Sequence, residues 1–154
     1  MIKIMFVCHG NICRSPMAEF LFKDLVKKKG ESENFYIRSS ATSMEEYGSP
    51  VHHGTRKILD RLGISCFSKR AELLGSADYQ KYDYFIGMDK RNIRNMERIF
   101  GGDKDNKIHL LLELAGISRD VADPWWTGDF EQTYQDIVLG INALYERVKE
   151  KNEN

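Results

Sequence analysis

Short apolar runs alternate with amphipathic stretches along the chain. The runs are rich in Ile, Val, Phe and Tyr and have the length of buried strands; they are residues 2–7, 35–39, 84–88 and 107–112. The amphipathic stretches repeat apolar residues at helical spacing; they are residues 16–29, 51–62, 93–100 and 130–150. Between them, residues 64–82 carry a weak pattern and predict only a short helix starting at 76–78.

The order of strands and helices predicts the fold class. Helices that follow strands imply right-handed crossovers, and hence a parallel sheet covered on both faces. In such α/β folds, ligands bind at the carboxyl ends of the strands. Cys8 follows the first predicted strand at that edge, and Asp89 follows a later one. We therefore expect one α/β domain over residues 1–154, with its site at this edge.

The composition argues against several classes of partner. The chain has 154 residues and 42% apolar content, which suffices for one hydrophobic core. Lys plus Arg and Asp plus Glu both number 23, the formal net charge is zero, and no long basic block occurs. This balance disfavours nucleic acid or a membrane surface as a partner. Any specificity for an anion must therefore be local.

Cysteine and histidine usage predicts a cytoplasmic protein that holds no metal. The uncharged run 4–7 is too short for a signal-peptide core or a membrane span. The three cysteines, Cys8, Cys13 and Cys66, cannot all pair within one chain, and a chain of this size folds without disulfides. The four histidines lack the spacing of Cys/His ligand pairs. We expect a reducing compartment, thiol chemistry, and no metal or other cofactor.

A candidate phosphate-binding loop lies between the first predicted strand and the first predicted helix. Five residues separate Cys8 from Arg14, enough for a ring of inward-pointing N–H groups, with Gly10 and Asn11 tolerating left-handed backbone. Ser15 as N-cap and Pro16 as first helical residue would direct the positive end of a helix dipole at this ring. The predicted phosphate-binding residues are His9, Gly10, Asn11, Ile12, Cys13, Arg14 and Ser15.

Two side chains of this loop fit covalent phosphate chemistry. A helix N-terminus, cationic neighbours and a hydroxyl donor such as Ser15 favour the thiolate of Cys8, which is then a nucleophile toward phosphorus. The planar fork of Arg14 can bind two oxygens of a phosphate and of its transition state, which a lysine cannot do. By spacing alone, a buried strand cysteine and an unrelated surface arginine would look the same. The preceding strand, the Gly-Asn pair and the Ser-Pro pair favour the catalytic interpretation.

A second candidate is Asp123-Pro124-Trp125-Trp126, in the loop before the last predicted helix. A departing alkoxide or phenoxide needs a proton, which Asp123 can supply before it activates water. Trp125 and Trp126 could stack an aromatic substrate ring or pack the loop down. Taken alone, Asp123 indicates an Asx-turn before proline. Because a cysteine nucleophile requires an acid, the catalytic role is favoured.

Both motifs resemble those of a known family. Residues 8–15, continuing into Pro16-Met17-Ala18-Glu19, resemble the signature of the low-molecular-weight protein tyrosine phosphatases, and Asp123-Pro124-Trp125-Trp126 resembles their acid loop. Residues 38–42, 48–50 and 88–89 also match in order and spacing, so that the resemblance covers nearly the whole chain. It implies a doubly wound four-stranded parallel sheet with helices on both faces, a three-layer α/β fold.

The resemblance also implies roles for individual residues. The catalytic residues it implies are Cys8 as nucleophile, Arg14 as phosphate clamp and Asp123 as acid and then base. Ser15 would be the hydroxyl partner of the thiolate, and Asn11 would brace the loop through residues such as Ser39. Cys13 would trap an oxidised nucleophile as a disulfide.

The wall of the pocket is expected to select the substrate. The predicted wall residues are Ile12, Glu45, Trp125 and Trp126. The depth of the pocket favours phosphotyrosine, because the phosphate on the shorter side chain of phosphoserine would not reach Cys8. Glu45 stands where some family members have an aromatic residue, and with Glu46 it is expected to favour basic residues beside the phosphotyrosine. The expected partners are phosphotyrosine-containing proteins, and the expected state is a monomer, with weak self-association allowed.

Three other functions compete with this one. The protein-arginine phosphatases resemble this chain but carry threonine where Ile12 stands, and isoleucine offers no hydrogen bond to a guanidinium group. Thioredoxin-coupled arsenate reductases share the scaffold but need a downstream cysteine pair; residues 79–89 contain none, and Cys66 stands alone. A non-catalytic phosphate-binding module has no use for both Cys8 and Asp123. Phosphotyrosine hydrolysis is therefore the favoured function.

Overall fold

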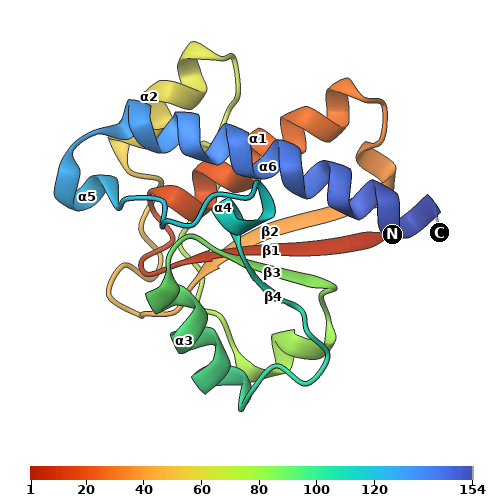
Figure 1. The fold of residues 1–154 in the computed structure, drawn as a ribbon. Coiled ribbons are helices and arrows are strands. Elements are labelled where there is room, and N and C mark those ends of the chain that lie inside the picture. The colour runs from red at the N-terminus through yellow and green to blue at the C-terminus, as the bar shows by residue number, and fades with distance from the viewer. Residues whose placement is uncertain (154) are drawn as a thin grey trace.

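The computed structural model describes residues 1–153 and contains a four-stranded parallel sheet (Figure 1). The strands are β1 (Ile2–Cys8), β2 (Phe35–Ala41), β3 (Tyr84–Gly87) and β4 (Ile108–Leu110). Their order across the sheet is β2-β1-β3-β4. In the register, Ile4 of β1 lies between Ile37 of β2 and Tyr84 of β3. The expected α/β fold on a four-stranded parallel sheet is confirmed.

The helices cover both faces of this sheet. One face carries α1, α2 and α6 with α4 beside them, and the other carries α3 with the 3-10 helix η2 (Figure 1). The helices are α1 (Arg14–Lys28), η1 (Ser32–Asn34), α2 (His53–Arg61), η2 (Ser76–Gln80), α3 (Lys90–Phe100), α4 (Leu111–Leu114), α5 (Pro124–Thr127) and α6 (Phe130–Glu153). Within residues 1–153, none of them combines the length and apolar character that crossing a membrane would require.

Burial on both faces explains why β1 is a continuous apolar run. Ile4 and Phe6 point into the larger core, under α1 and α6, whereas Met5 and Val7 point into the smaller core, under α3. Successive side chains of a strand alternate between the two sides of a sheet, so a strand that is buried on both sides carries apolar residues at consecutive positions.

The strand order places a crevice at the end of β1. From β1 the chain crosses to β2 on one side, and later returns to β3 on the other side of β1. The loops that follow β1 and β3 therefore diverge at the carboxyl edge, which is the usual ligand site of doubly wound sheets. The N-termini of α1 and α3 both begin there (Figure 1).

Several predicted elements differ from the structure at their ends. The strand predicted over 107–112 ends at Leu110, and the buried residues Leu111 and Leu112 begin α4 instead, because a short apolar run does not distinguish a strand from a buried helical turn. The helix predicted over 51–62 starts at His53, since the Nδ1 atom of His52 accepts from the Gly54 N–H and caps it. The short α5 was not predicted.

At Gly140, α6 lies close against Leu111 of α4. A Cβ atom there would overlap the buried side chain of Leu111, with Cδ1 at 2.7 Å and Cδ2 at 2.9 Å. We expect Gly140→Ala to lower the free energy of unfolding by about 1–3 kcal/mol through overpacking, despite the gain of about 1 kcal/mol in helix propensity. Urea unfolding would measure this, with the exposed Gln135→Ala on the same helix as control. A Gly140→Ala midpoint at or above the native one would contradict the prediction.

Candidate active site

The loop between β1 and α1 is held in shape by Asn11. This residue has left-handed backbone, with φ of 58°, whereas Gly10 does not. Its side-chain amide donates to Ser15 Oγ at 2.8 Å and to Ser39 Oγ at 2.9 Å, and its own N–H donates to Cys8 Sγ at 3.3 Å. The loop therefore curls back so that the thiol lies inside it, as a phosphate-binding ring requires.

Ser15 does not cap the first helix, and this part of the prediction is wrong. α1 begins at Arg14, its N-cap residue is Cys13, and no side chain caps it. The Ser15 hydroxyl is occupied elsewhere, because it lies 2.9 Å from Cys8 Sγ and accepts from Asn11. The first N–H groups of α1 are thus left without a side-chain acceptor, which suits them to bind an anion.

Arg14 is buried, with 3% of its side chain exposed, and is clamped by three groups. Its Nη1 atom donates to Asp89 Oδ2 at 2.7 Å and to the Val121 carbonyl at 2.9 Å, and its Nη2 atom lies 3.4 Å from Asp123 Oδ2. Burial opposes its charge, but the negative groups at Cys8, Asp89 and Asp123 outweigh burial and raise the pKa of Arg14. Within residues 1–153, the buried Nε atom has no partner, so its N–H is left to donate to a ligand.

Asp123 stands at the start of α5 and faces the same pocket. Its Oδ1 atom accepts from the Trp125 N–H at 3.1 Å, and Pro124 occupies the first helical position. Its Oδ2 atom is the one near Arg14. The Asx-turn, which was the alternative interpretation of Asp123, is thus present. The same carboxylate also lies at the site.

His52 connects the loop of Asp123 to the phosphate-binding loop. Its N–H donates to the Ile12 carbonyl at 2.9 Å. Its ring stacks on Phe130 at 5.0 Å between centroids and meets the edge of Trp125 at 5.7 Å. Trp125 and Trp126 remain 54% and 81% exposed, so they form the rim of the site and do not pack into the core.

These groups surround a cavity of about 480 Å³. The predicted site residues that line it are Cys8, His9, Gly10, Ile12, Cys13, Arg14, Glu45, Asp123, Trp125 and Trp126. Asn11, Ser15 and Ser39 lie below the loop and do not line the cavity. The sequence placed Glu46 near the entrance and Asp89 at this edge of the sheet, but it did not indicate the two other lining residues, Arg91 and Asn92. Their place in the sequence just after Asp89, which follows β3, was the available signal.

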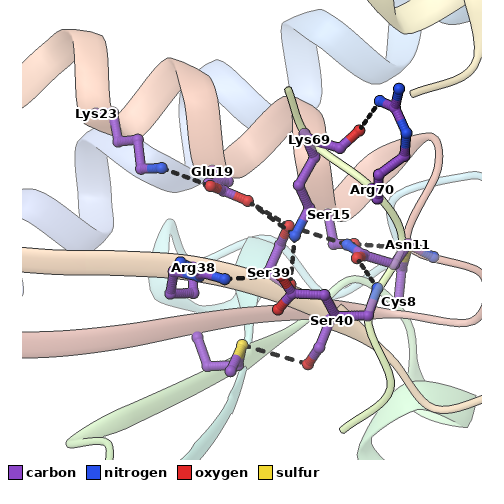
Figure 2. A network of polar contacts seen from close by, with 12 residues as sticks. Cys8, Asn11, Ser15, Glu19, Lys23, Arg38, Ser39, Ser40, Lys69 and Arg70 are labelled. Carbon is purple, nitrogen blue, oxygen red and sulfur yellow. Dashed lines mark hydrogen bonds and ion pairs between the residues drawn. The ribbon is translucent and has the colours of Figure 1, made fainter. Parts of the chain in front are cut away.

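A buried polar network supports the loop from beneath (Figure 2). Ser39 Oγ donates to Glu19 Oε1 at 2.5 Å, and Lys69 Nζ donates to the Ser39 carbonyl at 2.8 Å. Lys69 Nζ also lies 3.5 Å from Glu19 Oε1, and burial lowers the pKa of Lys69 although Glu19 opposes this. The supporting role of these two charged residues was not predicted: Lys69 lies in the weakly patterned segment, and Glu19 was noted only as the last residue of the signature that continues into α1.

Two further residues of the loop have distinct surroundings. Burial, and then the negative charge of Cys8, raise the pKa of the Cys13 thiol to about 12. His9 contacts the opposite rim, where its Nε2 atom lies 3.1 Å from the carboxylate of Glu45. Glu45 is 71% exposed, so it contributes charge at the mouth of the pocket and no deep wall.

The fold and the site together define a class: an α/β protein in which a cysteine and an arginine share a phosphate-binding loop that faces an aspartate. The family model "Low molecular weight phosphotyrosine protein phosphatase" matches residues 3–154. The low molecular weight protein-tyrosine-phosphatase YfkJ of Bacillus subtilis is 38% identical over 99% of both chains. The chain therefore belongs to the low molecular weight phosphotyrosine protein phosphatase family.

Solved structures agree with this assignment. The crystal structure of YfkJ superposes with a TM-score of 0.94, over 98% of this chain and 96% of that one. A low molecular weight protein tyrosine phosphatase from Streptococcus pyogenes is 41% identical, with a TM-score of 0.87 over 100% and 99% of the two chains. A Drosophila arginine phosphatase is 25% identical, with a TM-score of 0.87 over 96% and 98%.

Asp89→Asn tests the clamp on Arg14 without removing the cap of α3. The Oδ1 atom of Asp89 accepts from the Asn92 N–H and Oδ2 accepts from Arg14, so asparagine keeps the first acceptor and replaces the second with a donor. Loss of a hydrogen bond to a charged group predicts a decrease of roughly ten- to a hundredfold in kcat/KM for an aryl phosphate. Asp120→Asn, which alters a neighbouring acid that Arg14 does not contact, is the control. Native kinetics for Asp89→Asn would show that Asp89 does not orient Arg14.

Proposed function

We propose that this chain hydrolyses phosphotyrosine in proteins through a phosphocysteine intermediate, with Cys8, Arg14 and Asp123 as catalytic residues. The observation that carries the proposal is their convergence on one pocket, where the guanidinium of Arg14 lies 3.4 Å from the carboxylate of Asp123 and Cys8 lies within the loop that precedes Arg14. This set supplies a nucleophile, a clamp for the phosphate oxygens and a proton donor.

In the first step, Cys8 Sγ attacks phosphorus and the bond from phosphorus to the tyrosine oxygen breaks. The phosphate-binding residues 9–15 hold the other oxygens, chiefly through backbone N–H groups and the guanidinium of Arg14. The carboxylic acid of Asp123 gives its proton to the departing phenoxide. The Ser15 hydroxyl, 2.9 Å from Cys8 Sγ, stabilises the thiolate before attack.

In the second step, water attacks the phosphocysteine and the bond from sulfur to phosphorus breaks. The carboxylate of Asp123 accepts a proton from that water, which restores the acid for the next cycle. Cys8 leaves as a thiolate, and inorganic phosphate is released. Side chains and backbone N–H groups of this chain supply every group that the cycle requires, so the proposed cycle uses no metal or other cofactor.

The pocket favours phosphotyrosine over other phosphorylated side chains. Ile12 lines the cavity with an apolar surface, and the exposed rings of Trp125 and Trp126 flank its mouth, where an aromatic substrate ring would lie. A phosphoarginine guanidinium would find no hydrogen-bond acceptor on Ile12. The fold is shared with a Drosophila arginine phosphatase, so arginine phosphatase activity is the second candidate.

The remaining expectations complete the proposal. Residues 1–154 would act as one domain and a monomer, in the cytoplasm, on phosphotyrosine proteins and not on nucleic acid. The three cysteines, all buried and unpaired, suit a reducing compartment. Arsenate reduction is disfavoured because Cys66, in a separate cavity beside α2, lies outside the catalytic pocket.

Cys8→Ser is expected to abolish turnover and retain oxyanion binding, because Arg14 and the loop remain while the attacking thiolate is lost. Stopped-time assays of phosphate release and calorimetric titration with vanadate would measure the two properties. Cys66→Ser is the matched control, since it changes a buried thiol away from the loop. Near-native turnover by Cys8→Ser would eliminate the mechanism, and equal kcat/KM for phosphoarginine and phosphotyrosine peptides would eliminate the substrate assignment.

Asp123→Asn is expected to lower kcat by roughly 10²- to 10⁴-fold, the range typical of lost general acid catalysis. The loss should be greatest for aryl phosphates whose phenols are poor leaving groups, because these depend most on proton donation. A series of substituted phenyl phosphates would measure this dependence. Asp129→Asn, an exposed acid at the start of α6, is the control. An equal loss for good and poor leaving groups would contradict proton donation by Asp123.

A further inference from the structure

A second cavity, of about 580 Å³, is lined by residues of β4, α3 and α6. The strand β4 is the edge of the sheet, and α3 and α6 lie on opposite faces of that sheet (Figure 1). Its buried lining is apolar and includes Ile108 and Leu110 of β4. Its exposed lining consists of three cations, Lys90 and Arg94 from α3 and Arg147 from α6, together with Asn106 and Glu113. We call this cavity the basic groove.

The cations of the basic groove are not neutralised by the protein. Among residues 1–153, no carboxylate forms an ion pair with Lys90, Arg94 or Arg147. Glu113 is the one acidic residue that the lining contains. Burial lowers the pKa of His109, also in the lining; Arg147 and Lys151 lower it further, and Asp103 opposes them.

The first turn of α3 lines both the basic groove and the catalytic pocket. Lys90 lines the groove, and the next residue of α3, Arg91, lines the catalytic pocket beside Asp89. The opposite side of that pocket is formed by Glu45 and Glu46. The mouth therefore carries opposite charges on its two sides, and the cationic side extends away from it along α3.

We infer that the basic groove, with Arg91, is a docking surface for an acidic segment of the phosphoprotein substrate, next to its phosphotyrosine. The inference rests on the proposed function. It adds a feature of the substrate, the acidic segment, that the catalytic pocket itself does not bind. Glutamate or aspartate side chains would meet Lys90, Arg94 and Arg147, and an apolar side chain between them would cover Ile108 and Leu110. A basic residue on the other side of the phosphotyrosine would face Glu45.

The lining favours a peptide over a nucleic acid as the polyanion. Among the described residues it contains no Phe, Tyr or Trp, the large rings on which bases stack, and His109 is its one ring-bearing residue. The formal net charge of the chain is zero, which gives no long-range attraction to a phosphate backbone. The charge that favours an acidic segment is confined to this groove and to Arg91.

Matched phosphotyrosine peptides test the inference. Each peptide carries a Glu-Leu-Glu segment on one side of the phosphotyrosine, either N-terminal or C-terminal, and a control peptide carries Gln-Leu-Gln in its place. We expect one of the two placements to raise kcat/KM about tenfold over its glutamine control at low salt, mainly through KM, with the advantage shrinking as salt is added.

Two exposed substitutions locate the effect. The double variant Arg94→Gln, Arg147→Gln should lose the preference for glutamate while its kcat/KM for p-nitrophenyl phosphate stays native, since neither residue lines the catalytic pocket. Charge reversal at both positions, to Glu, should transfer the preference to a Lys-Leu-Lys peptide. Arg56→Gln, an exposed arginine on α2, is the control and should change nothing.

The outcomes separate this inference from the proposed function. Failure of the native protein to hydrolyse p-nitrophenyl phosphate and the peptides would overturn the proposed function. Normal hydrolysis with equal kcat/KM for the glutamate and glutamine peptides in both placements would overturn the docking surface alone. A glutamate preference that survives in the Arg94→Gln, Arg147→Gln variant would also overturn it. So would competition by a single-stranded oligonucleotide but not by an unphosphorylated glutamate peptide.

Discussion

The ion pair between Arg14 and Asp89 is the interaction on which the site depends. It joins the first residue of α1 to the residue that follows β3, at a distance of 2.7 Å and with 3% of the Arg14 side chain exposed. A guanidinium this deeply buried is stable only with charged and hydrogen-bonded partners. Asp89 and the Val121 carbonyl provide these on one nitrogen, so the rest of the fork is turned toward the pocket and Asp123.

The loop around Cys8 is held by hydrogen bonds that join its own Asn11 to polar groups beneath it. Left-handed backbone at a residue other than glycine costs free energy, and it persists where the surroundings fix it. Asn11 is fixed by Ser15, Ser39 and the Glu72 N–H, which donates to its side-chain oxygen at 3.0 Å. The buried pair of Glu19 and Lys69 continues this network into the core (Figure 2). Chemistry at the thiol thus depends on residues that no substrate touches.

Although the formal net charge of the chain is zero, the charged side chains around the catalytic pocket are unevenly distributed. Glu45 and Glu46 lie on one side of the mouth, and Arg91 lies on the other. Exposed charges at a rim contribute to orientation and encounter more than to affinity. Such an arrangement distinguishes one direction of a bound peptide from the other, which neither the phosphate-binding loop nor the tryptophan rim can do.

The sequence by itself determined the strand and helix order, the parallel sheet and the motifs around Cys8, Arg14 and Asp123, because these follow from local periodicity and spacing. It could not determine the end of β4, since buried strands and buried helical turns share the same apolar pattern. Only the tertiary structure decided that Asp89 clamps Arg14 and that Lys69 reaches Glu19. It also decided that the Ser15 hydroxyl contacts the thiol of Cys8 instead of capping α1. These contacts join segments far apart in the chain, and a side chain with several possible partners binds the one that folding brings within hydrogen-bond distance.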